Sequence, residues 1–224
     1  SSSLVGSEMC IRDSPAAVRS ALLPVLGAAR HRPTHHRREM HTAMDLCFGL
    51  LPFGLFGGYL IMRIFAPLAF PAEYLDGTHG ASAVDVFTVL LAGWGLTLLA
   101  TPTYTSLMAG PYPWRFTLFI LLVLMAAVVL GYTLIVLGPA QPGHRLYAAA
   151  VASSLSAGVL LLLSWRMSGG MDFVRERQDD WALALLGGGF VIIGLISGTH
   201  WWLLGLPLFL FTRRGWQAVR ATLD

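Results

Sequence analysis

The chain has 224 residues, of which 55% are hydrophobic and 12% are charged, and its mean hydropathy is positive. A soluble domain of this length carries roughly twice that share of charged residues, so the composition excludes an ordinary soluble globular protein. All 15 basic residues are arginines, and the formal net charge is only +3. This modest charge does not favour nucleic-acid binding. Arginines at the ends of apolar stretches are more typical of a membrane protein.

Residues 1–14 precede the first apolar stretch, and residues 4–14 read LVGSEMCIRDS. This string resembles an in-frame translation of the adaptor used in transposase-based sequencing libraries. We therefore interpret residues 1–14 as a sequencing artefact and leave them out of the fold prediction. On this interpretation Cys10 is not native. Cys47 is then the single thiol, which cannot form an internal disulfide.

Residues 15–43 form a basic segment with no acid before Glu39. This composition is typical of an organelle transit peptide, but we favour translated upstream sequence, with the true start at Met40 or Met44. On either interpretation we expect the segment to be disordered, and a disordered segment does not fix the geometry of a metal site. The histidines that we therefore do not assign to a metal are His31, His35, His36 and His41.

Residues 44–224 are predicted to form the membrane domain. A hydrocarbon core of about 30 Å needs about 20 apolar residues in a helix. Runs of this kind occupy residues 46–66, 84–103, 116–138 and 146–165, and a longer apolar stretch occupies residues 181–212. The sequence therefore predicts an all-α fold, a polytopic integral membrane helix bundle of five to six membrane segments.

The stretch at residues 181–212 decides between five and six segments, because it is too long for one upright crossing and short for two. Arginines in short loops are retained on the cytoplasmic or matrix side. If the stretch turns back near residues 197–200, the arginines that follow it join the side that already holds Arg115 and Arg166. We therefore predict that the last pair forms a short hairpin. A re-entrant pair and one long helix kinked at Pro207 are the alternatives.

Two GxxxG patterns indicate where helices approach each other closely. Because lipid is as apolar as leucine, association between membrane helices depends on close backbone packing, which small residues allow. Spacing does not distinguish packing within the chain from packing against another subunit, although internal packing is the commoner outcome. The predicted packing positions are Gly54 and Gly58 in the first segment, and Gly194 and Gly198 in the last.

Three polar residues in or near the membrane segments are candidates for ligand binding or proton transfer, because such groups are costly in lipid. Arg63 lies near the end of its helix, where its stem can reach the headgroups, and an anion contact is the functional alternative. Asp85 lies where a carboxylate caps a helix start, an interpretation that we favour over proton transfer. His200 lies beside two tryptophans and could ligate a haem or chlorophyll-type metal or relay protons.

No motif in the sequence implies an enzyme or a particular cofactor. Our first hypothesis is a non-catalytic subunit of a larger membrane complex, for example an energy-transducing one, which helps assembly or stability by helix packing. The second is a small solute or ion transporter or channel, and the third is a pigment- or haem-binding protein that uses His200. The expected partners are membrane lipids and other membrane subunits, with no nucleic acid. The expected location is the bacterial inner membrane, with an organelle inner membrane as the alternative.

Overall fold

The computed structural model describes residues 9–29, 32–75, 81–110, 112–136 and 142–176, together with residue 220. Within these ranges the regular structure is entirely helical. The helices are α1 (Met9–Ala28), α2 (Pro33–Ala69), α3 (Ala72–Leu75), α4 (Ala83–Ala109), α5 (Pro113–Val136), α6 (Pro142–Ser168) and α7 (Gly170–Glu176).

Local sequence signals explain where several helices begin and end. The helices α2, α5 and α6 each begin at a proline, whose fixed φ suits the first turn of a helix and whose missing N–H costs nothing there. The helix α4 begins after Ser82, whose hydroxyl accepts a hydrogen bond from the Asp85 backbone at 3.1 Å. Gly169, at a φ of 78°, allows the sharp turn from α6 into α7.

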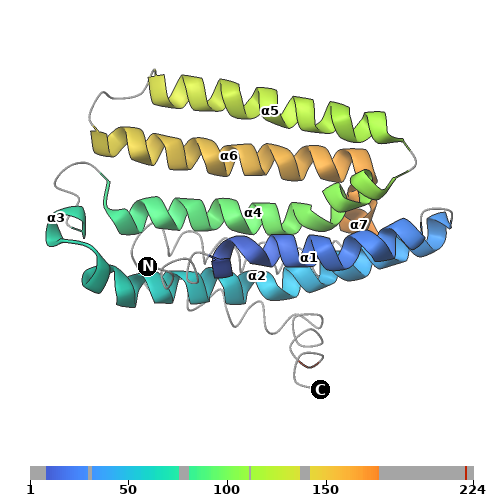
Figure 1. The fold of residues 1–224 in the computed structure, drawn as a ribbon, viewed down its shortest axis with the longest axis horizontal. Helices are drawn as coiled ribbons and strands as arrows, with labels where there is room; N and C mark the ends of the chain where they lie inside the picture. Colours follow the sequence, from blue (N-terminus) through green and yellow to red (C-terminus); the bar gives the residue numbers. More distant parts are fainter. Residues whose placement is uncertain are drawn as a thin grey trace, which may run out of the picture.

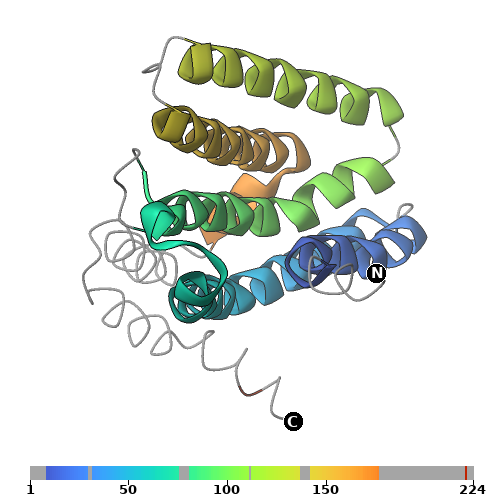
Figure 2. The ribbon, with the colours of Figure 1, turned by 60° about the vertical axis from the view of Figure 1, so that its left-hand side comes forward.

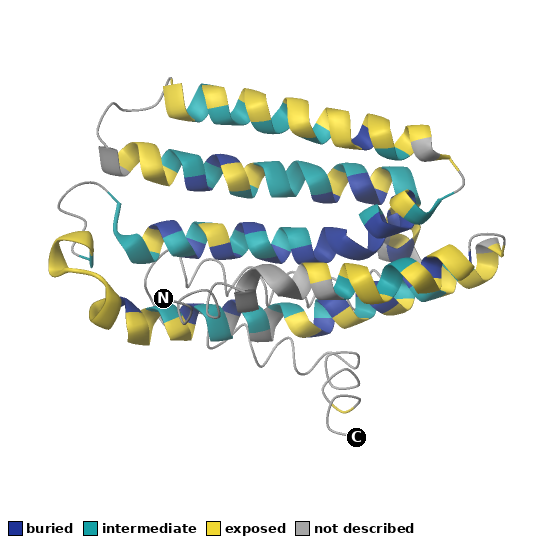
Figure 3. Ribbon diagram, viewed as in Figure 1, coloured by how far each residue is buried: buried dark blue, intermediate teal, exposed yellow. Residues whose placement is uncertain are grey.

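The long helices lie side by side in the order α5, α6, α4, α2, with α1 against α2 and α4 (Figures 1 and 2). The helix α4 is therefore the centre of the bundle. In the most apolar 18-residue stretch of α4, 44% of the residues are buried. The corresponding stretches of α6 and α5 are 17% and 6% buried. Figure 3 shows the same gradient, from the mostly buried α4 to the mostly exposed α5.

Three helical stretches in the described part of the chain are long and apolar enough to cross a membrane: Ala83–Ala109, Trp114–Val136 and His144–Ser168. Two shorter apolar stretches, Val18–Ala28 and Gly57–Ala69, accompany them. The predicted all-helical membrane bundle is thus confirmed, whereas the count of five to six segments is not. The first predicted segment, residues 46–66, lies within the continuous helix α2, and residues 181–212 lie outside the described residues.

The described parts of the basic segment belong to two helices, residues 15–28 to α1 and residues 33–43 to α2. Three apolar side chains at helical spacing, Val18, Leu22 and Leu26, lie on one side of α1 and pack into the core. Residues four apart share a face of a helix, so these side chains give α1 an apolar stripe. This stripe explains why the segment folds onto the bundle. The origin of residues 1–14 stays a prediction.

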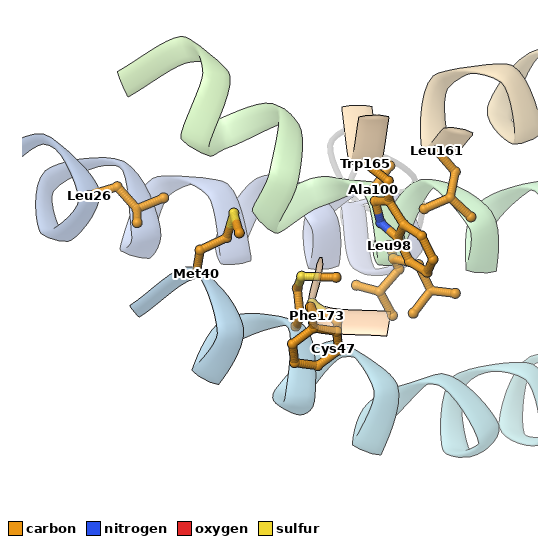
Figure 4. Close-up of a cluster of buried hydrophobic side chains, with 10 residues drawn as sticks. Leu26, Met40, Cys47, Leu98, Ala100, Leu161, Trp165 and Phe173 are labelled. Atoms are coloured by element: carbon orange, nitrogen blue, oxygen red, sulfur yellow. The ribbon is translucent and has the colours of Figure 1, made fainter. Parts of the chain in front are cut away.

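The main buried cluster joins five helices of the described part of the chain (Figure 4). Leu26 of α1 and Cys47 of α2 are fully buried there, and Phe173 of α7 is 1% exposed. The cluster consists of Leu26, Met40, Met44, Cys47, Leu98, Leu99, Ala100, Leu161, Trp165 and Phe173.

Glycines on two sides of α4 bring it close to both neighbours. A Cβ atom added to Gly95 would lie 2.8 Å from Leu51 of α2, and one added to Gly93 would lie 3.0 Å from the Cα atom of Ser154 in α6. The Ser154 hydroxyl also donates a 2.6 Å hydrogen bond to the Val89 carbonyl across the same interface. The close approach of α4 and α6 therefore depends on the absence of a side chain at residue 93.

We predict that Gly93→Ala destabilises the bundle by about 1–3 kcal/mol, because the α6 backbone must move to admit the methyl group. Gly131→Ala is the matched control, since nothing lies within 4 Å of a Cβ atom at that position of α5. Thermal unfolding of the purified variants in detergent measures the difference. Equal midpoints for the two variants would contradict the packing argument.

Candidate functional site

A histidine joins three helices at the end of the bundle where α4 finishes. The Nε2 atom of His36 in α2 lies 2.8 Å from the Ser106 hydroxyl of α4. Its Nδ1 atom lies 3.2 Å from the backbone carbonyl of Leu26 in α1. We call His36, Ser106 and Leu26 the polar junction. The contact with Ser106 spans 70 residues and the contact with Leu26 spans 10, so His36 fixes the start of α2 against both α4 and α1.

The acceptor at Leu26 determines which ring nitrogen of His36 carries the proton. A carbonyl oxygen only accepts, so Nδ1 is the donor to Leu26. In the neutral ring Nε2 then accepts from the Ser106 hydroxyl, and in the charged ring Nε2 donates to it. Ser106 is 7% exposed, so its hydroxyl depends on this contact for a partner within the protein. Both ring nitrogens of His36 therefore have partners within the polar junction.

The last turns of α4 contain a buried cluster of hydroxyl groups around Pro102. Proline removes one helical hydrogen bond, and α4 changes direction towards this end (Figure 1). The Thr101 hydroxyl donates to the Thr97 carbonyl at 2.9 Å, and the Thr105 hydroxyl donates to the Thr101 carbonyl. These bonds keep the hydroxyls satisfied inside an apolar bundle, where an unsatisfied polar group is costly.

A hydroxyl pair connects this end of α4 to α6. The side-chain oxygens of Thr103 and Ser164 lie 2.8 Å apart, and both residues are fully buried. Each hydroxyl also lies within hydrogen-bond distance of a carbonyl in its own helix. The two hydroxyl protons can form only two of these three hydrogen bonds at a time. One hydroxyl therefore donates across the interface while the other donates to a carbonyl of its own helix. The pair holds α4 against α6 about three helical turns beyond the glycine contact.

The short helix α7 is attached to α2 beside the polar junction. The Phe173 ring meets the His41 ring edge-on, with centroids 4.9 Å apart. Arg37 and Asp172 form an exposed ion pair with a 3.6 Å separation, which contributes at most about 1 kcal/mol. The burial of Phe173 therefore contributes more to this attachment than the ion pair does.

Of the three predicted polar site residues, the structure describes Arg63 and Asp85. The Asp85 carboxylate accepts from the Ser82 backbone and from its hydroxyl, at 3.3 and 2.7 Å, which makes the capping contact that the sequence favoured. The Arg63 guanidinium lies over the Tyr59 ring at 6.0 Å, near the end of α2. Neither residue reaches the polar junction. His200 lies outside the described residues.

The first GxxxG pattern faces α4 of the same chain. A side chain at Gly54 would collide with the Trp94 ring, and a Cβ atom at Gly58 would lie 2.8 Å from Leu91. These two glycines thus admit large α4 side chains into the α2 surface. The second pattern, Gly194 and Gly198, lies outside the described residues.

Sequence reasoning missed the polar junction and the hydroxyl pair. His36 stood in a segment that we expected to be disordered, and its neighbours in the histidine cluster point elsewhere: His35 contacts Glu39 at 3.7 Å and His41 contacts Phe173. Within the described residues no group of histidine, cysteine and acidic side chains has the arrangement of a metal site. The alternation of threonines around Pro102 was the available signal, because hydroxyls in an apolar helix need partners.

The fold and its apolar helices define an α-helical integral membrane protein. No family model, no curated protein and no solved structure matches the chain.

We predict that His36→Ala lowers the free energy of unfolding by about 1–3 kcal/mol, because it leaves the Ser106 hydroxyl and the Leu26 carbonyl without their partner. His35→Ala is the matched control, since this exposed side chain makes only a long contact with Glu39 and should change stability by less than about 0.5 kcal/mol. Thermal unfolding measures both variants.

A double-mutant cycle with Ser106→Ala tests the contact itself. The effects of His36→Ala and Ser106→Ala should not add, because each variant removes the same hydrogen bond. Additive effects, or an equal loss for His35→Ala, would show that the polar junction does not hold α2 in place.

Proposed function

We propose that the protein is a non-catalytic subunit of a larger membrane complex, which it stabilises by helix packing. The observation that carries this proposal is the surface of α5. The helix has 24 residues and packs mainly against α6, with minor contact to α4. Phe119 is fully buried, but side chains on the other sides of α5, such as Leu124 and Val128, are more than half exposed. Among the described residues, a helix that packs mainly against one neighbour leaves a long apolar surface for another subunit.

The buried hydroxyl groups in the last turns of α4 support the same proposal, because their partners lie inside the bundle. The hydroxyls of Thr101, Thr103 and Thr105 bond backbone carbonyls or Ser164, and Ser106 bonds His36. These groups therefore contribute to the packing of the chain's own helices. The connections between spanning helices are also short: α4 ends at Ala109 and α5 begins at Pro113. A protein of this shape acts mainly through its membrane-facing surfaces.

In this proposal the partners are lipids and the membrane helices of other subunits, and the bacterial inner membrane is the location. An apolar helix of a partner would lie against the outer side of α5, away from α6. Such contacts derive their stability from van der Waals packing rather than from the hydrophobic effect, so the partner surface should be complementary in shape.

Transport of a small solute or ion is the second candidate, and the proline-interrupted end of α4 favours it. Interrupted helices are where many transporters bind their substrates, and the contact between His36 and Ser106 places a histidine beside this end of α4. Purified protein in liposomes would then move a proton or solute without other subunits, and His36→Ala would abolish the movement. Liposomes that stay tight with the intact protein would leave the subunit proposal in place.

We predict that a photo-crosslinking amino acid at Val128 forms a discrete protein adduct in native membranes, because this α5 position would face the partner. The matched control is Ile61 of α2, which is 56% exposed against 59% for Val128 and lies across the bundle from α5. The crosslinking amino acid at residue 61 should react with lipid instead of protein. Gel mobility and mass spectrometry of the adducts distinguish the two results.

Two outcomes would count against the subunit proposal. One is that Val128 labels only lipid in native membranes. The other is that Val128 and Ile61 label the same proteins to the same extent, as random collisions in the bilayer would. A gentle detergent extract run on a native gel gives an independent check, since a subunit should migrate with its larger partners.

A further inference from the structure

Arginines gather at one end of the bundle, where α4 and α6 finish and α2 and α5 begin (Figure 1). The contact between His36 and Ser106 and the ion pair between Arg37 and Asp172 confirm that these ends lie together. At the opposite end, the described arginines of α2 and α6 are Arg63 and Arg145. The arginines of the first end are Arg32, Arg37, Arg38, Arg115, Arg166 and Arg175.

Among these arginines, Arg115 has a distinct environment. Its guanidinium carbon lies 4.9 Å from the centroid of the Tyr112 ring and 5.7 Å from that of Trp114. Both rings are more than half exposed, and Arg115 itself is exposed. Stacking on aromatic faces restrains the guanidinium, while its N–H groups point outward in the plane of the fork. Arg115 is therefore held ready to donate several hydrogen bonds to a planar or tetrahedral anion.

The position of this group along the bundle identifies the anion. The spanning stretch of α5 begins at Trp114, so Tyr112, Trp114 and Arg115 lie where the hydrocarbon core gives way to the headgroups. Tyrosine and tryptophan prefer this level of a bilayer. The phosphate of a lipid headgroup lies at the same depth, and a negatively charged leaflet attracts arginines near its surface.

We propose that Tyr112, Trp114 and Arg115 form a docking surface for the phosphate of an anionic phospholipid in the leaflet at the arginine-rich end. The aromatic rings pack against the upper acyl chains, and the Arg115 guanidinium donates to the phosphate oxygens. The neighbouring arginines raise the local concentration of anionic lipid. This docking surface does not depend on the proposed role as a complex subunit.

The test measures phosphatidylglycerol binding to the purified full-length chain in neutral detergent by native mass spectrometry. Arg115→Gln should raise the apparent Kd about fivefold, the effect of one arginine near an anionic surface. Arg115→Lys should retain part of the affinity, because it keeps the charge but loses the planar fork. Arg145→Gln is the matched control at the opposite end, and it should bind phosphatidylglycerol as the unaltered chain does.

Further variants and ligands keep the result interpretable. Tyr112→Ala should weaken phosphatidylglycerol binding in the same direction by releasing the guanidinium, and it leaves the charge unchanged. Phosphatidylcholine has the same phosphate but no net charge, so Arg115→Gln should weaken its binding less than it weakens the binding of phosphatidylglycerol. The proposal is overturned if Arg115→Gln and Arg145→Gln weaken phosphatidylglycerol binding equally, or if neither does. It is also overturned if inorganic phosphate displaces the lipid, because the site would then be one for a free anion.

Discussion

The fold depends on the close approach of α4 to α2 on one side and to α6 on the other. In lipid there is little hydrophobic gain from bringing two apolar helices together, so the gain must come from surfaces that fit. The glycines Gly93 and Gly95 remove side chains from the two opposed faces of α4. On the α2 side, Gly54 and Gly58 receive the large side chains that α4 does present. Helices that lie further out, such as α5, are held in position through their contacts with α6 and α4.

The same central helix carries the polar groups that organise one end of the bundle. The turns around Pro102 hold hydroxyls that an apolar environment would penalise if they were left alone. Each has a partner: the backbone of α4, Ser164 of α6, or His36 of α2. The contact with His36 helps to explain how the basic segment at residues 15–43 becomes part of a membrane protein. Its apolar stripe packs on the core, and its histidine completes a hydrogen bond that α4 needs.

Prediction from the sequence succeeded where the signal was local. Hydropathy located the spanning helices, and the position of Asp85 just before an apolar run indicated a helix start, because both effects act within a few turns. In residues 15–43 the arginine content masked the apolar spacing of Val18 and Leu22, which pack against the core. The contact of His36 with Ser106 spans 70 residues and leaves no local pattern. The number of membrane segments also depends on long-range packing, so hydropathy alone did not determine it.

The two proposals concern different parts of the same helix and make α5 the outward-facing element of the protein. Along its length α5 is supported mainly by α6, so its tilt and depth are weakly constrained by the rest of the bundle. A headgroup contact at Arg115 would fix the depth of its first turn, because the rings of Tyr112 and Trp114 hold that arginine at the membrane surface. If the depth of α5 is fixed at one end, the apolar side chains along its exposed side lie at defined heights in the membrane. A partner helix can pack closely only against side chains at defined heights. Lipid docking would therefore prepare α5 for a partner without contributing to the contact itself.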